Sequence, residues 1–517
     1  MVSSRLVLSL FLTVCFPLAA VGSTPGKVVI AQGVDPTTLD AMNQFETPSM
    51  NLVAQIYDSL LDRDQNLTIV PGLAAELPKL VSPNVWEFKL RKGVRFHNGE
   101  EFNSASVKFS LERLITPANK LRGATLFGPL DRVEVIDDYT VRLHTKKPWS
   151  LFATAMSFRQ ASMYPPKAYA DKDSAFISKN PIGTGPYKLA RWVKDEEIVL
   201  EANEQYWRGA PKIKTVMFRP IPDDAVRVAS LQNGEVDIAV NIPPHLASII
   251  ANHPRLFLST VPSVRTIQLM FYTHQFDTQH KLMGPYQGPT ADKRVRQAIT
   301  YALDVDEIIR TLLDGKGLRV ATLLTSKHFG FDPAIKPITL DQGQARKLLA
   351  AAGYPNGLDI TLNAPQGRYL KDREVAEAVG GQLSKAGIRT TVRTFEFVTY
   401  LNNFIYTHKA GPVWLIGWGA PSLAPENVYV PLFHSGSTFS NYSNPEFDQM
   451  ADEAQATMDE QKRRALWQRI TKLLVEDAAV APLYQQVDLY GVSKRLQWSA
   501  RSDELIRAYD IAPKDAK

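Results

Sequence analysis

The chain has 517 residues, more than one hydrophobic core usually serves, so two or three domains are expected. Its formal net charge is +6, but basic and acidic residues are interspersed, and the densest basic cluster, residues 461–464, has the pattern of a solvated helix face. The absence of a basic stripe interleaved with aromatic residues argues against a nucleic-acid-binding protein.

The first residues have the pattern of an export signal. Arg5 precedes an apolar run from Leu6 to Ala20, and small residues continue as far as Ser23. A run this short favours a cleaved signal peptide over a membrane-spanning helix, which needs about 20 apolar residues. We therefore expect residues 1–23 to be removed on export to the periplasm.

The single cysteine, Cys15, lies inside this apolar run. The bulky Val14 stands where a lipidation site normally has a small residue, so a soluble exported protein is favoured over a lipid-anchored one. Removal of the signal leaves a mature chain without cysteine. Disulfides, thiolate catalysis and cysteine-bound metals are therefore not expected.

Strands and helices are predicted to alternate along the chain, from the two-residue and 3.6-residue periods of apolar positions. The pattern predicts strands at 27–31, 236–240, 359–362 and 389–394, a hairpin at 133–144, and helices at 50–61, 223–233, 292–313, 340–352 and 372–386. This alternation is typical of α/β domains rather than a β-sandwich or a helix bundle.

Residues 85–114 form the most informative local pattern. A strand is predicted first, then a turn at Asn98 and Gly99, and then a helix capped by Asn103 or Ser104. As a unit, this segment resembles the signature of the extracytoplasmic solute-binding proteins of peptide, nickel and opine ABC importers, known as family 5.

Four further blocks carry the same resemblance in the family's order: 182–189 with 206–207, 292–308, 345–357, and 417–418 with 441–445. The resemblance implies an α/β, two-lobed periplasmic-binding-protein-like fold of the class II, clam-like type, with an extra inserted domain. It divides the chain into lobe I (24–60, 179–265 and 486–517), domain II (61–178) and lobe III (266–485).

The resemblance also implies a function. The chain is expected to be a monomeric periplasmic receptor that closes on a peptide or a related small solute and delivers it to an ABC permease complex in the inner membrane. The alternatives are a receptor of the same fold for a non-peptide solute (an opine, a sugar conjugate, a glutathione-like compound or a metal chelate) and, less favoured, an enzyme on this scaffold.

Catalytic motifs give the enzyme alternative little support. The sequence has no GxSxG elbow and no HExxH pair. His274 and His280 have a loose spacing that fits structural or surface histidines better than metal ligands. We therefore expect no catalytic residue, no metal and no cofactor.

The segment after Gly417 and Trp418 bears on the ligand. In peptide-binding relatives it carries an aspartate that pairs with the ligand's α-ammonium, but here Pro421 stands at that place. A buried ammonium without a counter-charge is costly. Either Glu46 of lobe I supplies the charge, or the ligand has no such ammonium.

Arginines are the positive candidates. Arg368, between a predicted strand and a helix, is expected to bind a ligand carboxylate through its planar fork, and Arg265, near the crossover into lobe III, is the next candidate. Trp418 is expected either to stack on the ligand or to fill the lobe core. The full set of candidate ligand-binding residues is Arg368, Trp418, Arg265, Glu46, Phe45, Trp414 and Ser422.

Overall fold

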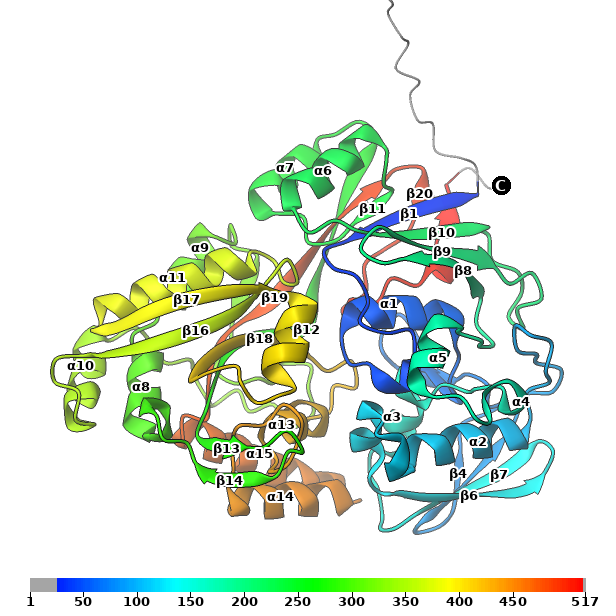
Figure 1. Ribbon diagram of the computed structural model, residues 1–517, viewed down its shortest axis with the longest axis horizontal. Helices are drawn as coiled ribbons and strands as arrows, with labels where there is room; N and C mark the ends of the chain where they lie inside the picture. The colour runs from blue at the N-terminus through cyan, green and yellow to red at the C-terminus, as the bar shows by residue number, and fades with distance from the viewer. Residues whose placement is uncertain (1–25, 515–517) are drawn as a thin grey trace, which may run out of the picture.

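The structure is a computed structural model that describes residues 26–514. The predicted signal peptide at 1–23, with Cys15, lies outside the described residues. Two α/β halves are joined by long strands, and a smaller sheet lies beside one half (Figure 1). The names lobe I, domain II and lobe III are kept below for the ranges given above.

One mixed sheet runs through both lobes. Among the described residues, its strands lie in the order β17 (Ile388–Glu396), β16 (Leu358–Gln366), β18 (Val413–Gly419), β12 (Leu256–Phe271), β19 (Val480–Ser493), β11 (Ile238–Ala239), β1 (Lys27–Gln32), β10 (Thr215–Pro220), β9 (Glu197–Ala202) and β8 (Tyr187–Val193), with β15 (Gly317–Arg319) paired to β19. β12 and β19 pair along both lobes, so these two strands carry the sheet across the boundary.

The β12–β19 pair changes register between Pro262 and Thr266. Such an irregularity bends a strand and re-aims its side chains. Arg265 lies within it, and the predicted end of lobe I at 265 falls at the same place. One of the candidate ligand-binding residues thus lies within this irregularity of the β12–β19 pair.

Lobe I contains α1 (Thr47–Ile56), α6 (Asp224–Asn233) and α7 (Pro244–Ala251). The predicted helix at 50–61 was wrong at both ends. α1 begins at Thr47 because Pro48 suits the first turn of a helix, and it ends before Tyr57. The last predicted residue, Leu61, instead begins β2 (Leu61–Arg63), which pairs with β3 (Ile69–Pro71).

Lobe III holds most of the helices: α8 (Lys293–Tyr301), α9 (Val305–Thr311), α10 (Gln342–Ala351), α11 (Asp372–Lys385), α12 (Phe397–Tyr400), α13 (Glu426–Phe433), α14 (Pro445–Ala456) and α15 (Glu460–Glu476), with the hairpin β13 (His274–Phe276) and β14 (Leu282–Pro285). The predicted helix at 292–313 is two helices, because the Asp304 side chain accepts the Glu307 N–H and caps a new helix. The predicted βαβ unit is present, with β16 and β17 parallel.

Domain II has its own sheet, in the order β4 (Lys79–Ser82), β5 (Val85–Lys89), β7 (Thr140–Thr145) and β6 (Leu130–Asp137), with α2 (Ser104–Ile115), α3 (Phe152–Met156), α4 (Pro166–Tyr169) and α5 (Ser174–Lys179). The prediction for 85–114 was right in its main features. Asn103 caps α2, Gly99 has φ of +89°, and the apolar face of the helix is buried. The C-terminal segment adds the pair β20 (Leu496–Gln497) and β21 (Ala512–Pro513).

β1 shows how the cores are arranged. Val28 and Ile30 belong to a core shared with domain II, whereas Val29 and Ala31 belong to the core that extends into lobe III. Successive side chains of a strand point to opposite faces, so a strand buried on both sides serves two cores. The sheet therefore contributes side chains to both cores.

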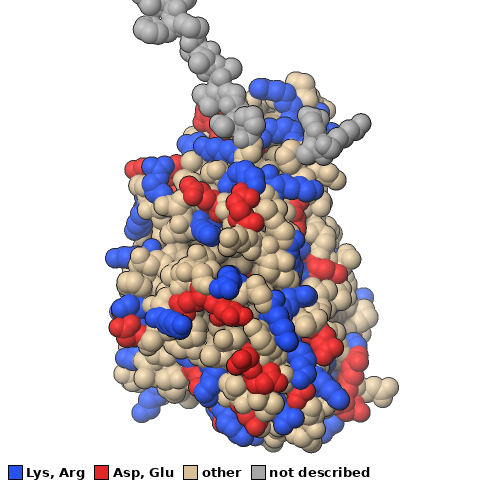
Figure 2. Space-filling model, turned by 90° about the vertical axis from the view of Figure 1, so that its right-hand side faces the viewer, with Lys and Arg blue, Asp and Glu red and all other residues tan. Residues whose placement is uncertain are grey.

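On the face shown in Figure 2, basic and acidic side chains are mixed and no large area of one sign is visible. Within residues 26–514, no helix combines the length and apolar character needed to cross a membrane.

Candidate functional site

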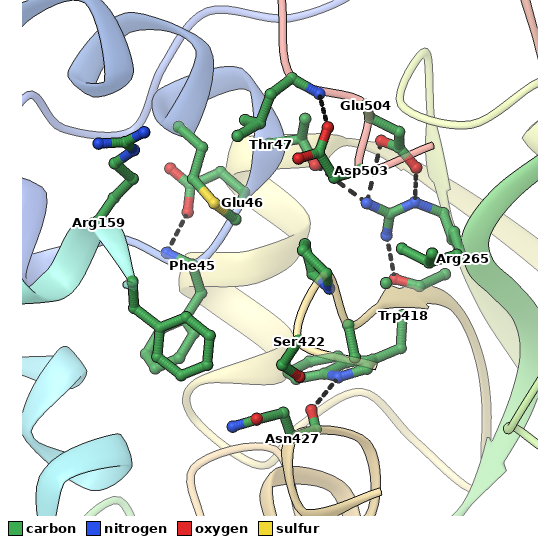
Figure 3. Close-up of a pocket in the computed structure, with 18 of the residues that line it drawn as sticks. Phe45, Glu46, Thr47, Arg159, Arg265, Trp418, Ser422, Asn427, Asp503 and Glu504 are labelled. Atoms are coloured by element: carbon green, nitrogen blue, oxygen red, sulfur yellow. Dashed lines mark hydrogen bonds and ion pairs between the residues drawn. The ribbon is translucent and has the colours of Figure 1, made fainter. Parts of the chain in front are cut away.

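A cavity opens between the lobes and domain II (Figure 3). It holds about 1230 Å³ of empty space, including the part open to solvent. Its walls come from the loop before α1, from domain II, from β12 and β18 of the sheet, and from the C-terminal segment around residues 503–507. Chain segments far apart in sequence thus meet at one place.

Arg265 and Arg368 lie together in the cavity wall, and both bind Glu504. Oε2 of Glu504 accepts hydrogen bonds from Nη2 of Arg265 at 3.0 Å and from Nη2 of Arg368 at 3.1 Å. Nε of Arg265 donates to the other carboxylate oxygen (Figure 3). Both guanidinium groups also donate to Oγ1 of Thr47, at 3.0 and 2.9 Å.

Glu504 is buried and takes a left-handed backbone conformation, with φ of +63°. A non-glycine residue in this region is strained, which is commonest at functional sites. Burial would raise the pKa of Glu504, but Arg265 and Arg368 outweigh burial and hold the pKa below its usual range. An ionised internal carboxylate therefore occupies the place that was predicted for a ligand carboxylate.

The loop that carries Arg368 is held by Asp372 at the start of α11. The Asp372 carboxylate accepts backbone N–H bonds from Gly367 at 3.1 Å, Arg368 at 2.8 Å and Tyr369 at 3.0 Å. Gly367 has φ of +81°, which a glycine adopts without strain. The guanidinium group of Arg368 is thus positioned by its own loop as well as by Glu504.

Two nitrogens of Arg368 form no hydrogen bond within the described residues: Nε, which is buried, and Nη1. Within residues 26–514, Nη1 of Arg368 has no hydrogen bond and retains solvent contact, whereas Nη2 is bound to Thr47 and Glu504. Arg265, by contrast, also donates Nη1 to the Gly417 carbonyl at 2.7 Å. Of the two arginines, Arg368 is the better placed to contact a solute.

Glu46 is a buried carboxylate in the same cavity. It accepts hydrogen bonds from the hydroxyls of Thr37 and Ser49 and from the backbone N–H of Phe45 at 3.1 Å. Among the described residues, no basic side chain pairs with it. A buried carboxylate with neutral donors alone favours a cation as its remaining partner.

Aromatic side chains form one wall. The Phe439 ring makes edge contacts with Phe45, Tyr406 and Trp418, at centroid distances of 5.8, 5.5 and 4.9 Å. Trp418 donates its indole N–H to the Asn427 carbonyl at 2.8 Å, so its ring faces the cavity in a fixed orientation. Such a wall suits the apolar part of a solute.

The structure brings six of the seven candidates to the cavity: Phe45, Glu46, Arg265, Arg368, Trp418 and Ser422. Trp414 is not among the lining residues. It precedes Ile416 by two positions on β18, and its side chain is fully buried in the lobe III core. Pro421 lines the cavity and brings no charge to it. The nearest carboxylate after it in the sequence, Glu426, accepts the indole N–H of Trp467. Among the described residues, Glu46 is thus the carboxylate lining this cavity near the aromatic wall that forms no ion pair, whereas Glu426 is bound to Trp467 and lies outside the lining.

Sequence reasoning missed a second charged group in the cavity, made of Asp62, Arg63 and Arg159 with Asp503, Glu504 and Arg507 of the C-terminal segment. Arg159 is labelled in Figure 3. The family resemblance rested on residues 85–450, so it carried no information about the C-terminal segment. The unusual density of charge at residues 501–507 was the available signal.

The two histidines considered as loose metal ligands lie away from the cavity. His280 shares a hydrogen bond of 2.7 Å with His408, and His274 shares one of 2.9 Å with Thr273. In the part of the chain that the structure describes, no three His, Cys, Asp or Glu side chains gather as a metal-binding group.

Comparisons with known proteins bear on this site. The family model of the bacterial extracellular solute-binding proteins, family 5 (middle region), matches residues 68–440. The glutathione-binding protein GsiB of Pectobacterium atrosepticum is 28% identical over 462 residues, which is 87% of each chain.

Two solved structures share the fold at low identity. The periplasmic binding protein DppA of Helicobacter pylori, in complex with the peptide STSA, has a TM-score of 0.85 at 23% identity and covers 95% of this chain and 98% of its own. AgaA of A. tumefaciens R10, in complex with agropinic acid, has a TM-score of 0.83 at 23% identity, with 95% and 99% covered.

These matches confirm the predicted two-lobed α/β fold and the family indicated by the five sequence blocks. The family model alone spans more than two thirds of the chain. The chain therefore belongs to family 5 of the bacterial extracellular solute-binding proteins, the receptors that deliver solutes to ABC importers.

Proposed function

We propose that this receptor captures a small zwitterionic solute of the peptide type, and that glutathione is the first compound to test. The observation that carries the proposal is a cavity with Glu46, a buried carboxylate without a cation, and Arg368, whose Nη1 is free. A solute with an ammonium and a carboxylate matches both. The GsiB relatives, which are named for glutathione, support this choice.

Glutathione has one ammonium and two carboxylates, and its thiol-bearing centre would face the aromatic wall. The departure at Pro421 agrees with a solute whose ammonium binds on the Glu46 side rather than beside the Gly417-Trp418 strand. With a solute bound, the aromatic residues around Phe439 would help to exclude water from the cavity and so strengthen the charge contacts there.

Calorimetry with the purified protein tests the proposal. Glutathione is expected to bind, and glutathione acetylated on its amine is expected to bind more weakly by roughly 2–5 kcal/mol, because Glu46 is left unpaired. Absence of binding heat with glutathione would contradict the choice of solute. Mass spectrometry of the solute released from protein purified under native conditions would then identify the correct class.

Export, oligomeric state and lack of catalysis are part of the same proposal. The mature protein is a periplasmic monomer, cleaved between about residues 19 and 24, as the pattern of the N-terminal residues indicates. N-terminal sequencing of the periplasmic form tests the cleavage, and a lipid-modified Cys15 would contradict it. Incubation with glutathione followed by mass spectrometry should show the compound unchanged.

A further inference from the structure

Asp62 lies in the cavity wall at the centre of a group of arginines, of which Arg63, Arg159 and Arg507 also line the cavity. It pairs with Arg159 at 2.7 Å, Arg507 at 2.5 Å and Arg208 at 3.5 Å. Arg63 lies next to it in sequence and also lines the cavity. We call Asp62, Arg63, Arg159, Arg208 and Arg507 the Asp62 cluster.

The positive charges of this cluster exceed its negative charges. Its four arginines face Asp62 and Asp503, and Asp503 is itself paired with Arg501 at 2.7 Å. Counting Arg501 and Asp503 with the cluster, five arginines meet two carboxylates, which leaves three positive charges in excess. Asp510, whose charge also acts on Arg507, is exposed to solvent, where its effect is screened.

Part of this excess is buried, although Arg208 and Arg507 are partly exposed. Arg63 is 8% exposed and Arg159 is 7% exposed. An uncompensated buried charge destabilises a folded protein, so such a charge is retained where a partner of opposite sign arrives. Burial lowers the pKa of Arg63 to about 10, which still leaves its guanidinium charged at neutral pH.

Several nitrogens of the cluster lack partners. Arg63 donates Nη1 to the Leu67 carbonyl at 2.6 Å, but its Nε and Nη2 are buried without a hydrogen bond. Within residues 26–514, Nη1 of Arg159 and Nη1 of Arg507 also form no hydrogen bond and keep solvent contact. Among the described residues, the cluster therefore has guanidinium nitrogens without partners, buried on Arg63 and open to solvent on Arg159 and Arg507.

We propose that the Asp62 cluster is an anion site that binds a carboxylate of the captured solute, with Arg63, Arg159 and Arg507 as its donors. It is separate from the Arg265–Arg368 pair, whose charge Glu504 already neutralises in part. Planar guanidinium groups match a planar carboxylate through paired N–H donors. The inference rests on the proposed function for the rest of the solute, and it requires that solute to carry a second anionic group.

The alternative is a purely structural cluster that joins β2 to the rest of domain II and to the C-terminal segment. Arg63→Met distinguishes the two roles, because it leaves all three pairs of Asp62 in place and removes an arginine whose Nε and Nη2 have no partner. If the cluster is an anion site, relief of the uncompensated buried charge should offset the lost hydrogen bond from Nη1 to the Leu67 carbonyl, and the ligand-free variant should melt close to the wild type. If Arg63 is structural, the melting temperature should fall.

Binding gives the second measurement. Calorimetry with glutathione should show Arg63→Met binding roughly tenfold more weakly or worse, because a charge-assisted pair is lost. Arg63→Lys should recover part of the affinity, since the charge is kept without the fork. Arg132→Met, at an exposed position in domain II, is the matched control and should bind as the wild type does. Wild-type affinity in Arg63→Met would overturn the proposal.

A test without glutathione separates this proposal from the choice of solute. Acetate should raise the melting temperature of the ligand-free protein above that in chloride at equal ionic strength, because an anion bound to the native state stabilises it. The difference should shrink in Arg63→Met and persist in Arg132→Met. If acetate stabilises all three proteins equally, the anion site is wrong. If glutathione fails but the acetate difference follows Arg63, only the choice of solute is wrong.

Discussion

Glu504 determines what the arginine pair offers to a solute. Its carboxylate takes one guanidinium fork from Arg265 and one nitrogen from Arg368, so the pair presents one net positive charge rather than two. Ser263 donates a further hydrogen bond to Glu504 at 3.2 Å. A single solute carboxylate can therefore bind at Arg368 without leaving a second guanidinium unpaired.

Replacement of Arg368 tests this arrangement. Arg368→Ala should weaken binding of a carboxylate-bearing solute by roughly 2–5 kcal/mol, because the solute charge is left unpaired in the cleft. Lysine should not restore full affinity, since it lacks the planar fork. Calorimetry measures both, with Arg373→Ala on the exposed side of α11 as the control. Unchanged affinity would remove Arg368 from the site.

Replacement of Glu46 tests the cationic side of the solute. Glu46→Gln keeps the size of the side chain and removes its charge, so binding of an ammonium-bearing solute should weaken by roughly 2–5 kcal/mol. The acetylated solute should lose little, because it has no ammonium to pair. Calorimetry with both compounds gives the comparison, and Glu377→Gln, exposed on α11, is the control. Equal losses for the two compounds would contradict an ammonium at Glu46.

Asp488 should make stability depend on pH. Burial and the nearby charge of Glu504 raise the pKa of Asp488, although Gln486, Arg265 and Arg368 act in the opposite direction. The folded state therefore holds a proton that the unfolded state releases near pH 4, and stability falls as pH rises from there through the raised folded pKa.

The Asp488→Asn variant should lose this pH dependence. Its free energy of unfolding should exceed that of the wild type by more at pH 8 than at pH 5, since the amide has no proton to lose. Urea unfolding at the two pH values measures the difference. Asp171→Asn, at an exposed position, should show no such change, and equal slopes for Asp488→Asn and the wild type would contradict the prediction.

At the scale of elements, β12 and β18 build the floor of the site. Arg265 pairs in register with Gly419, and Gly417 lies against Ile267 of the neighbouring strand. A Cβ at Gly417 would lie 2.7 Å from the Tyr369 ring and 2.9 Å from the Arg265 side chain. The absent side chain lets Arg265 and Tyr369 both reach the Gly417 carbonyl.

Gly417→Ala is therefore expected to disturb both stability and binding. The added methyl group should cost about 1–3 kcal/mol of stability by overpacking. Binding should weaken as well, because Arg265 and Tyr369 must move. Urea unfolding and calorimetry measure the two effects. Gly381→Ala, on α11 with open space around its Cβ position, is the control and should not be destabilised. A fully tolerated Gly417→Ala would show that the contact relaxes freely.

At the scale of the whole molecule, few contacts hold the rim of the cleft together. Ser150 of domain II donates to the Gln455 carbonyl of lobe III at 3.2 Å, Lys147 pairs with Asp452 at 4.0 Å, and Arg122 lies 3.9 Å from the centre of the Tyr406 ring. Exposed pairs of this kind contribute at most about 1 kcal/mol each. Opening the rim itself therefore costs little, whereas the buried contacts of Arg368 with Thr47 and Glu504 also join the lobes. A bound solute adds to these contacts and shifts the balance towards the closed state.

Small-angle scattering tests this closure. The radius of gyration should decrease when the cognate solute saturates the protein, because binding between the lobes favours the closed state. The bend at residues 262–266 of β12 is the expected place of hinge motion. The same titration of Glu46→Gln should need a higher solute concentration for the same change. An identical scattering profile with and without solute would argue against closure.

Local sequence pattern was enough for many of the elements and for the family. Caps and turn residues such as Asn103, Gly234 and Gly353 act within a few residues, so the ends of α2, α6 and α10 could be predicted from the sequence. The continuous predicted helix at 292–313 was wrong because its apolar period persists across a break that Asp304 caps. Six of the seven candidate residues lie in the cavity, although only Trp418 of these belongs to one of the five family blocks.

Tertiary structure alone decided the electrostatics of the site. Glu504 meets Arg265 across 239 residues and Arg368 across 136, and Asp62 meets Arg507 across 445. No local period encodes such pairs, because they depend on how β12 and β19 pass between the lobes and where the C-terminal segment returns. For the same reason Trp414 and Trp418, on one face of one strand, differ in role: the fold buries the first and leaves the second at the cavity.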